Sequence, residues 1–148
     1  MKSLTGGTVY SLSIHLVFVT KYRKKVIDAA MLVRLKEIFA LTCSKWECEL
    51  CEFNEVGLGE APSPNVLPTV GEEDHCHLLV EINPKVLISS FANNLKTVSS
   101  RLIRKEFPDR CAQFYKKAVF WKIGYFVSST GGANLETIKR YIQNQDTP

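Results

Sequence analysis

The fold is decided by the stretch Asp74-His75-Cys76-His77-Leu78-Leu79-Val80-Glu81-Ile82, which Asn83-Pro84 follows. An apolar run that ends at an Asn-Pro pair predicts a β-strand. Side chains alternate along a strand, so His75 and His77 share one face and the apolar side chains share the other, namely Cys76, Leu78, Val80 and Ile82. The apolar face predicts contact with a core. The other face predicts two imidazoles about 7 Å apart at their Cα atoms, from which both can bind one metal ion. A pair of surface histidines on a half-exposed strand is the alternative.

Length and composition predict a single domain that spans 1–148. Of the 148 residues, 45% are hydrophobic and 23% are charged, which suits a globular domain with its own core. The formal net charge of +4 permits a polyanionic partner. No apolar run approaches the roughly 18 residues of a membrane span, and the N-terminal residues contain no signal-peptide core. We therefore expect a cytoplasmic protein without membrane contact.

The five cysteines do not predict a disulfide framework, because their number is odd and no export signal precedes them. Cys48 and Cys51 have a spacing found in zinc sites. The alternation around them predicts a strand, however, and a strand places these two thiols on opposite faces. We expect ordinary buried or half-buried thiols.

The remaining hydrophobic patterns predict strands and helices in the order β-α-β-β-α-β-α. Apolar residues at steps of three and four after Ile88 predict the clearest helix, which Pro108 ends. Asp28 and Asn134 are suited to cap the other two helices. The strands are expected at 10–20, 46–53, 74–82 and 120–127.

This order is typical of an α+β fold of the ferredoxin-like or RRM-like type, in which a split β-α-β antiparallel sheet carries its helices on one face. The chain adds a C-terminal helix to that plan. The histidine pair is then expected to face away from the core helices. Three segments are expected outside the regular elements: a loose N-terminus at 1–8, a long loop insertion at 54–71 and a hinge at 128–133.

A basic cluster, Lys21-Tyr22-Arg23-Lys24-Lys25, directly follows the first predicted strand. Four cations around one aromatic ring suit phosphate contacts and a stacked base. We expect these five residues to contact nucleic acid, although a solvated turn is the ordinary alternative for such a run.

The last predicted helix carries two residues that can complete a site. Tyr141 and Gln145 are four positions apart and are therefore neighbours on one helix face. The amide oxygen of Gln145 is a suitable ligand for a hard divalent cation, and Tyr141 places a phenol near it. His15 is a third imidazole in the chain, for which a structural role is expected rather than one as a metal neighbour.

Three motifs of this chain also occur together in one known family. The first is His75-Cys76-His77, and the second joins Trp121 and the run 124–129 to the helix at 135–142. The third is the run from His15 to Arg23, which covers the later part of the first predicted strand and its exit. In their order, across about 10–145, they resemble the IS200/IS605-type single-tyrosine (Y1) transposases of the His-hydrophobic-His single-strand nuclease superfamily.

The resemblance implies a homodimeric enzyme that cuts and rejoins single-stranded DNA beside hairpins at the ends of a mobile element. Tyr141 would form a 5′-phosphotyrosine intermediate, and His75, His77 and Gln145 would hold Mg²⁺ or Mn²⁺. The basic cluster at 21–25 would contact hairpin DNA. No small-molecule substrate is implied.

Two features depart from the family pattern. The segment 54–71 makes the connection into the histidine strand longer than expected, and Glu72-Glu73 places two acids just before the motif. These acids would either support a histidine or repel DNA. Neither feature removes an expected catalytic residue.

Other functions stay open from the residues alone. An RNA-binding module without catalysis has the same sheet topology, although it leaves the histidine pair and the Tyr–Gln pair unexplained. Plasmid relaxases and replication initiators share the motif and the tyrosine chemistry, but they are usually larger and order these parts differently. A degenerate or housekeeping relative that processes chromosomal repeats would have the same residues.

Overall fold

The computed structural model describes the chain except residues 1, 5, 55, 58–72, 130–134 and 146–148. Its main sheet has five antiparallel strands in the order β5-β4-β6-β3-β7. These are β3 (Ser13–Val19), β4 (Glu49–Phe53), β5 (Val56–Gly57), β6 (His75–Glu81) and β7 (Phe126–Ser129). The helices are α1 (Ala29–Lys45), α2 (Ile88–Glu106), α3 (Pro108–Phe114) and α4 (Leu135–Gln143), and a short 3-10 turn, η1 (Lys21–Arg23), follows β3.

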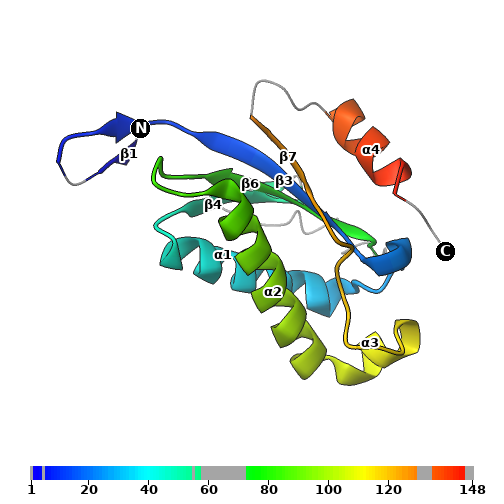
Figure 1. The fold of residues 1–148 in the computed structure, drawn as a ribbon. Coiled ribbons are helices and arrows are strands. Elements are labelled where there is room, and N and C mark those ends of the chain that lie inside the picture. The colour runs from blue at the N-terminus through cyan, green and yellow to red at the C-terminus, as the bar shows by residue number, and fades with distance from the viewer. Residues whose placement is uncertain (1, 5, 55, 58–72, 130–134, 146–148) are drawn as a thin grey trace, which may run out of the picture.

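The sheet carries helices on both faces. α1 and α2 cover one face, and α4 lies over the other (Figure 1). This is the predicted α+β fold with a ferredoxin-like arrangement of α1 and α2, to which α4 adds the expected C-terminal helix. No helix within the described ranges is long and apolar enough to cross a membrane.

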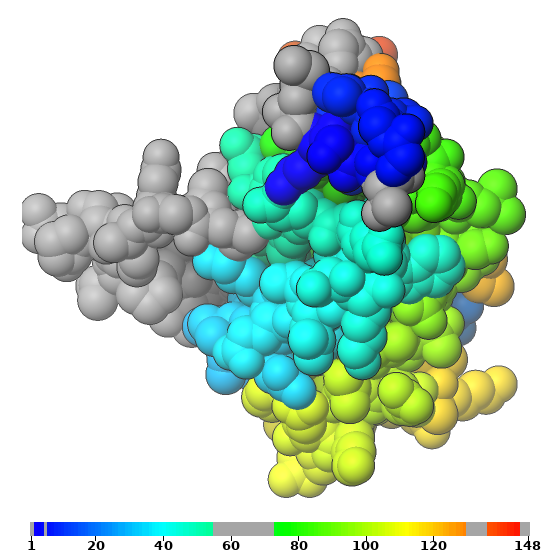
Figure 2. All heavy atoms as spheres, turned by 90° about the vertical axis from the view of Figure 1, so that its left-hand side faces the viewer, coloured from blue at the N-terminus to red at the C-terminus, as the bar shows by residue number. Residues whose placement is uncertain are grey.

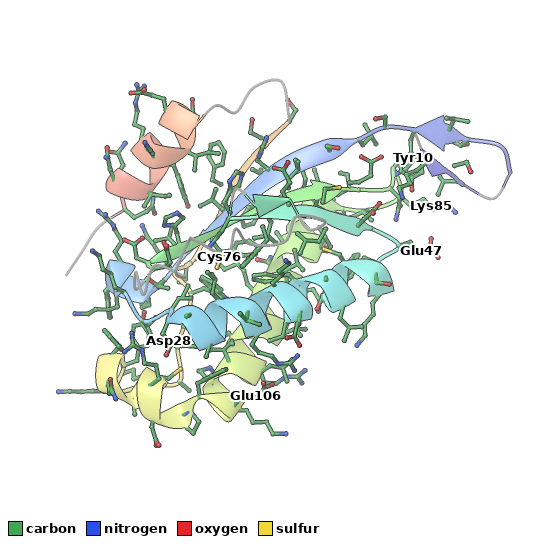
Figure 3. The ribbon with its side chains drawn as sticks, turned by 180° about the vertical axis from the view of Figure 1, so that it is seen from behind. Tyr10, Asp28, Glu47, Cys76, Lys85 and Glu106 are labelled. Atoms are coloured by element: carbon green, nitrogen blue, oxygen red, sulfur yellow. The ribbon has the colours of Figure 1, made fainter. Side chains whose placement is uncertain are left out.

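The main core lies between the sheet and the helices α1 and α2. On β6 the predicted apolar face is buried there, with Cys76, Leu78 and Val80 fully inaccessible, and Cys76 is labelled in this layer in Figure 3. α1 begins where predicted, because the Asp28 carboxylate caps it by accepting a hydrogen bond from the backbone N–H of Met31 at 2.9 Å. Burial of large side chains on this face, each contributing roughly 1.5–3 kcal/mol, drives the layers together.

A second and smaller apolar cluster lies on the opposite face of the sheet. Its members are Val17 and Val19 of β3, Phe126 of β7, and Ile138, Tyr141 and Ile142 of α4. We call it the α4 cluster. Together with the main core it buries β3 on both faces.

The N-terminal part of the first predicted strand belongs to a separate hairpin. Instead of extending β3, Val9–Tyr10 forms β2, which pairs with β1 (Lys2–Ser3) inside the segment expected to be loose. Viewed from that end of the molecule, the hairpin lies to one side of the surface made by α1 (Figure 2). The reason is the length of the partner: β6 ends at Glu81, opposite Ser13, so β3 has no strand to pair with before that residue.

The fourth predicted strand is also shorter and later than expected, since β7 begins only at Phe126. Phe120 and Trp121 are buried in the main core, and only Trp121 makes an isolated bridge, to Thr20. Gly124, at φ +89°, then turns the chain into β7. The helix α3 was not predicted, because Pro108, which ends the α2 pattern, also suits the first position of a new helix.

Two of the predicted irregular segments lie largely outside the described residues. Within 54–71 the structure describes Asn54 and the short strand β5, which pairs with β4. Within 128–133 it describes Ser128 and Ser129, and both belong to β7.

Candidate active site

His75 is the first residue of β6, and its side chain lies on the face away from the main core. A neighbouring carboxylate fixes the orientation of its ring. Its Nδ1 lies 2.9 Å from Oδ1 of Asp74. Burial by itself would raise the pKa of Asp74, but the hydrogen bond and charge of His75 and the charge of Arg23 outweigh it, so this pKa lies below its usual value. An ionised carboxylate only accepts hydrogen bonds, so Nδ1 of His75 donates to it, and Nε2 is the ring nitrogen left for a ligand.

His77 follows on the same face and contacts His15 of β3. Nδ1 of His15 lies 2.7 Å from Nε2 of His77, and the two rings stack with their centroids 4.9 Å apart. The backbone of His77 is fixed by Asn54, whose Oδ1 accepts from the His77 N–H at 2.8 Å. The sequence did not indicate Asn54 as a site residue, since it precedes a long irregular segment. His15 therefore lies next to the candidate site, through the register of β3 with β6.

These histidines form one wall of a cavity of about 650 Å³. α4 forms the facing wall with Ile138, Lys139, Ile142 and Gln143. The cavity is thus bounded by the two elements, β6 and α4, that the sequence predicted to supply the chemistry.

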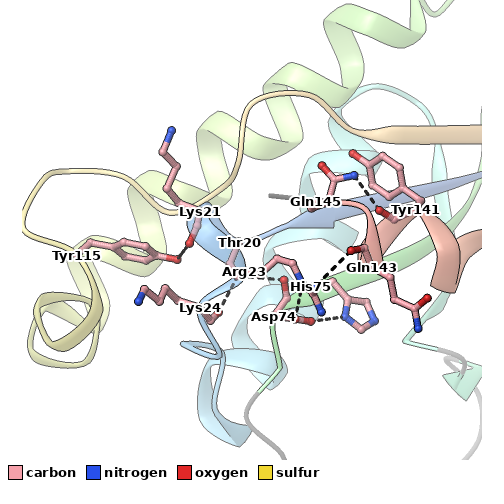
Figure 4. A network of polar contacts seen from close by, with 10 residues as sticks. All are labelled: Thr20, Lys21, Arg23, Lys24, Asp74, His75, Tyr115, Tyr141, Gln143 and Gln145. Carbon is pink, nitrogen blue, oxygen red and sulfur yellow. Dashed lines mark hydrogen bonds and ion pairs between the residues drawn. The ribbon is translucent and has the colours of Figure 1, made fainter. Parts of the chain in front are cut away.

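Tyr141 and Gln145 do not line this cavity. The ring of Tyr141 packs on Phe126 at a centroid distance of 5.4 Å, and its half-buried position raises the pKa of the phenol through desolvation. The amide of Gln145 donates to the Tyr141 carbonyl at 2.8 Å and accepts from the ammonium of Lys122. Figure 4 shows Tyr141 on the side of α4 that is turned away from His75, and Gln145 beside it, two residues beyond the end of α4 at Gln143. The structure therefore brings His75 and His77 together and leaves Tyr141 and Gln145 apart from them.

The basic cluster is divided by the turn η1. Arg23 lines the histidine cavity and joins its two walls, with Nε 3.4 Å from Oδ2 of Asp74 and Nη1 donating to the Gln143 carbonyl at 3.5 Å (Figure 4). Lys25 lines the same cavity. The other three members of the cluster, Lys21, Tyr22 and Lys24, line a different cavity. Arg23 and Asp74 are therefore site residues whose link the sequence did not predict, because 51 positions separate them.

The donor set fits a divalent cation in part. His75, whose Nδ1 is engaged by Asp74, and His77 share one face of β6, as two ligands of one ion require. Nε2 of His77 is engaged by His15, and the Gln145 oxygen by Lys122. Among the residues that the structure describes, no three His, Cys, Asp or Glu side chains form a metal-binding group. Gln145, the expected third ligand, lies outside the histidine cavity.

Comparison with known proteins assigns the chain to a family. The model of the family described as "Transposase IS200 like" matches residues 8–56 and 62–145. The chain belongs to this transposase family. The transposase of insertion sequence IS200 from Salmonella typhimurium is 33% identical over 144 residues, which is 97% of this chain and 82% of that protein. The ISDra2 transposase TnpA of Deinococcus radiodurans is 27% identical over 139 residues, 94% of this chain and 87% of that protein.

Solved structures agree with the assignment. One is the crystal structure of a Deinococcus radiodurans R1 protein that is described as a transposase. It superposes on this chain with a TM-score of 0.78 and 28% identity, over 100% of both chains. A REP-associated tyrosine transposase bound to a REP hairpin has a TM-score of 0.50 and 10% identity, covering 96% of this chain and 68% of that one. The second likeness concerns the fold alone. The family predicted from the three sequence motifs is confirmed, and the roles expected for Tyr141, His75, His77 and Gln145 stay predictions.

Proposed function

We propose that this transposase cleaves and rejoins single-stranded DNA at the ends of a mobile element, with Tyr141 as the nucleophile. One observation carries the proposal: the two histidines of β6 face, across a cavity of about 650 Å³, the helix on which Tyr141 lies. The cavity is within the size range of small-ligand sites. Arg23 and Lys25 add positive charge to its rim, which favours a phosphate there.

In the proposed reaction, Oη of Tyr141 attacks the scissile phosphorus. The bond from Oη to phosphorus forms while the bond from phosphorus to the 3′-oxygen breaks, which leaves a 5′-phosphotyrosine and a 3′-hydroxyl. The phenol loses one proton and the 3′-oxygen gains one. Because the new ester conserves the bond energy, a later 3′-hydroxyl can reverse the step and join a different strand.

His75 and His77 would hold Mg²⁺ or Mn²⁺, with Gln145 as a third ligand. When bound, such an ion supplies charge stabilisation at the phosphate and at the leaving oxygen. Two imidazoles and one amide oxygen are softer ligands than magnesium prefers, which favours manganese. Asp74 orients His75 for this task, and Gln145 must exchange its bond to Lys122 for a place at the cavity.

The position of Tyr141 supports a homodimer. Within one chain the phenol packs on Phe126 and does not line the histidine cavity. We therefore assign the attacking phenol either to a rearranged α4 of the same chain or to the α4 of a second copy, and a dimer permits both arrangements.

The DNA partner proposed is a single strand that contains hairpins. The support is the fold shared with the REP-associated transposase, which is bound to a REP hairpin, and the net charge of +4. Contacts from Lys21, Tyr22, Arg23, Lys24 and Lys25 would be mainly to phosphates and would therefore weaken with salt.

The test uses single-stranded oligonucleotides from both flanks of the gene, with Mn²⁺ or Mg²⁺, analysed on denaturing gels. Wild type is expected to give a protein–DNA adduct that duplex DNA does not give. Tyr141→Phe and His75→Ala are expected to lose it, whereas Tyr10→Phe, at the remote hairpin β1–β2, is the matched control and keeps it. Cleavage without an adduct that survives Tyr141→Phe would identify a metal-dependent hydrolase instead.

Mixing two inactive proteins separates the two assignments of α4. If a second copy supplies Tyr141, mixed dimers of Tyr141→Phe and His75→Ala chains recover one complete site and form adduct. If each chain uses its own α4, the mixture stays inactive. DNA binding with no cleavage on either flank would favour a degenerate relative or a binding module.

A further inference from the structure

A second cavity, of about 560 Å³, lies on the other side of the turn η1. Four lysines and three aromatic rings line it, together with Val119. The lysines are Lys21 and Lys24 of the η1 segment and Lys116 and Lys117 after α3, and the rings belong to Tyr22, Phe114 and Tyr115. No carboxylate is among the described residues that line it. We call it the lysine–aromatic cavity.

The wall that η1 forms is fixed by hydrogen bonds. The Tyr115 hydroxyl donates to the Lys21 carbonyl at 2.8 Å, and the Thr20 hydroxyl contacts the Lys24 carbonyl at 2.7 Å (Figure 4). Tyr115 and Thr20 are themselves buried. The turn is therefore held from both of its ends.

Between these two anchors the backbone adopts a left-handed conformation at two consecutive residues, with φ +60° at Tyr22 and +52° at Arg23. Such a conformation is costly for residues other than glycine. Because of this conformation the two adjacent side chains line different cavities. Arg23 lines the histidine cavity, whereas Tyr22 lines the lysine–aromatic cavity. Tyr22 is 44% exposed, so its side chain is accessible to a ligand.

The composition of the lysine–aromatic cavity matches one class of ligand. Aromatic rings provide stacking surfaces for a base of any sequence, and ammonium groups without competing carboxylates attract phosphates. The ammonium of Lys21 lies 5.3 Å from the centre of the Tyr22 ring, so charge and stacking surface are adjacent. A simple anion would leave the rings unused, and an apolar ligand would leave four lysines unpaired.

We propose that the lysine–aromatic cavity binds one unpaired nucleotide of the same DNA strand that enters the histidine cavity, its base on the Tyr22 and Phe114 rings and its phosphates among the lysines. The inference rests on the proposed function for its DNA substrate. Because one rigid turn separates the two cavities, the anchored nucleotide fixes how many nucleotides lie between it and the cleaved phosphate. The cavity is then a specificity determinant of the cleavage position.

The test measures binding rather than cleavage, and uses Tyr141→Phe protein throughout so that no strand is cut. Each unpaired position of the flank oligonucleotides is replaced in turn by an abasic site, and affinity is read from fluorescence anisotropy. At one position the loss of the base is expected to weaken binding by about 5- to 100-fold. In a protein that also carries Tyr22→Gly, the same abasic site has no further effect. Glycine is chosen because it adopts φ +60° without strain.

A second pair of variants tests the phosphate contacts. Lys116→Ala with Lys117→Ala is expected to reduce the slope of log affinity against log salt by about 1.4, since each single-strand phosphate contact contributes about 0.7. Lys45→Ala with Lys85→Ala removes the same charge from exposed positions at the opposite end of α1 and beyond β6, and leaves the slope unchanged.

The outcomes distinguish this inference from the proposed function. If wild type forms the Tyr141 adduct but Tyr22→Gly retains the wild-type abasic profile, the cavity is not a nucleotide site and the proposed function stands. If no adduct forms but one abasic position depends on Tyr22, the nucleotide site stands and the chemistry is wrong. Equal losses at all positions, or tighter binding of the corresponding RNA strand, would overturn the assignment of a DNA nucleotide to the cavity.

Discussion

Replacing Ile138 by alanine should release α4 while leaving the rest of the protein folded. Ile138 is 5% exposed and belongs to the α4 cluster, which is separated from the main core by the sheet. α4 has nine residues, and a helix this short is marginal in water without packing. Its stability therefore depends on the contacts with Val17 and Val19 of β3.

The expected size of the effect follows from the lost packing. An Ile→Ala change in a packed site costs about 2–5 kcal/mol, and about 1.4 kcal/mol corresponds to a tenfold change in an equilibrium constant. The opening equilibrium of α4 should thus increase by at least about 30-fold. The main core loses no contact, so the melting temperature should stay within about 2 °C, since even 1 kcal/mol shifts it by roughly 2–4 °C in a domain of this size.

Hydrogen exchange followed by mass spectrometry measures this, because it reports local opening and global unfolding separately. Leu95→Ala, at a fully buried position of α2 in the main core, is the matched control and should lower the melting temperature by about 5–15 °C. Unchanged exchange of α4 in Ile138→Ala would refute the packing argument. A fall in melting temperature as large as that of Leu95→Ala would show that α4 belongs to the cooperative core.

Three further predictions concern single groups. Asp74→Asn should weaken Mn²⁺ binding, measured by calorimetry, by about 10- to 100-fold because His75 loses its carboxylate partner. The control Asp109→Asn, at an exposed position, should bind Mn²⁺ as wild type does. An equal loss of affinity in both variants would point to a general charge effect. Tyr22→Gly should raise the free energy of unfolding in urea by about 0.5–1 kcal/mol, whereas Lys24→Gly, at φ −70°, should lower it; destabilisation by both changes would contradict the backbone argument. Burial lowers the pKa of Lys96 to about 8, from 10.5. Between these two pKa values the unfolded chain binds more protons at Lys96 than the folded chain does. The contribution of Lys96 to the free energy of unfolding should therefore rise as pH increases from about 8 to 10, and should be lost as pH falls through 8. Urea midpoints of wild type should show this rise, and Lys96→Met should not; parallel pH curves for the two proteins would refute it.

The parts of the fold that the sequence predicted correctly are those with a regular pattern and a clear boundary. Alternation from His75 to Ile82 marked β6, and Asp28 marked the start of α1. The errors arose where a local pattern does not reveal the partner. Tyr10 continued the alternation of β3, but the end of β6 decided where pairing stops. Phe120 and Trp121 had the composition of a strand, although they are core side chains on an irregular segment.

The sequence predicted which residues belong to the candidate site better than it predicted how these residues contact one another. His75 and His77 share a face because a strand alternates, and that geometry needs no tertiary information. The separation of Tyr141 from them depends on how α4 packs against Phe126, which no spacing in the sequence encodes. The contact of His15 with His77 depends on strand register, and the split of the basic cluster depends on two left-handed residues.

The burial of β3 on both faces has a consequence for synthesis on the ribosome. This strand leaves the exit tunnel early, yet its neighbour β6 follows only in the middle of the chain, and β7 and the covering helix α4 are made last. Until then its edges and its Val17–Val19 face are unprotected, and such edges readily pair with other chains. A premature stop ahead of Phe126 would therefore leave one edge of β3 unpaired, whereas a stop just after Ser129 would pair that edge but still leave the Val17–Val19 face uncovered.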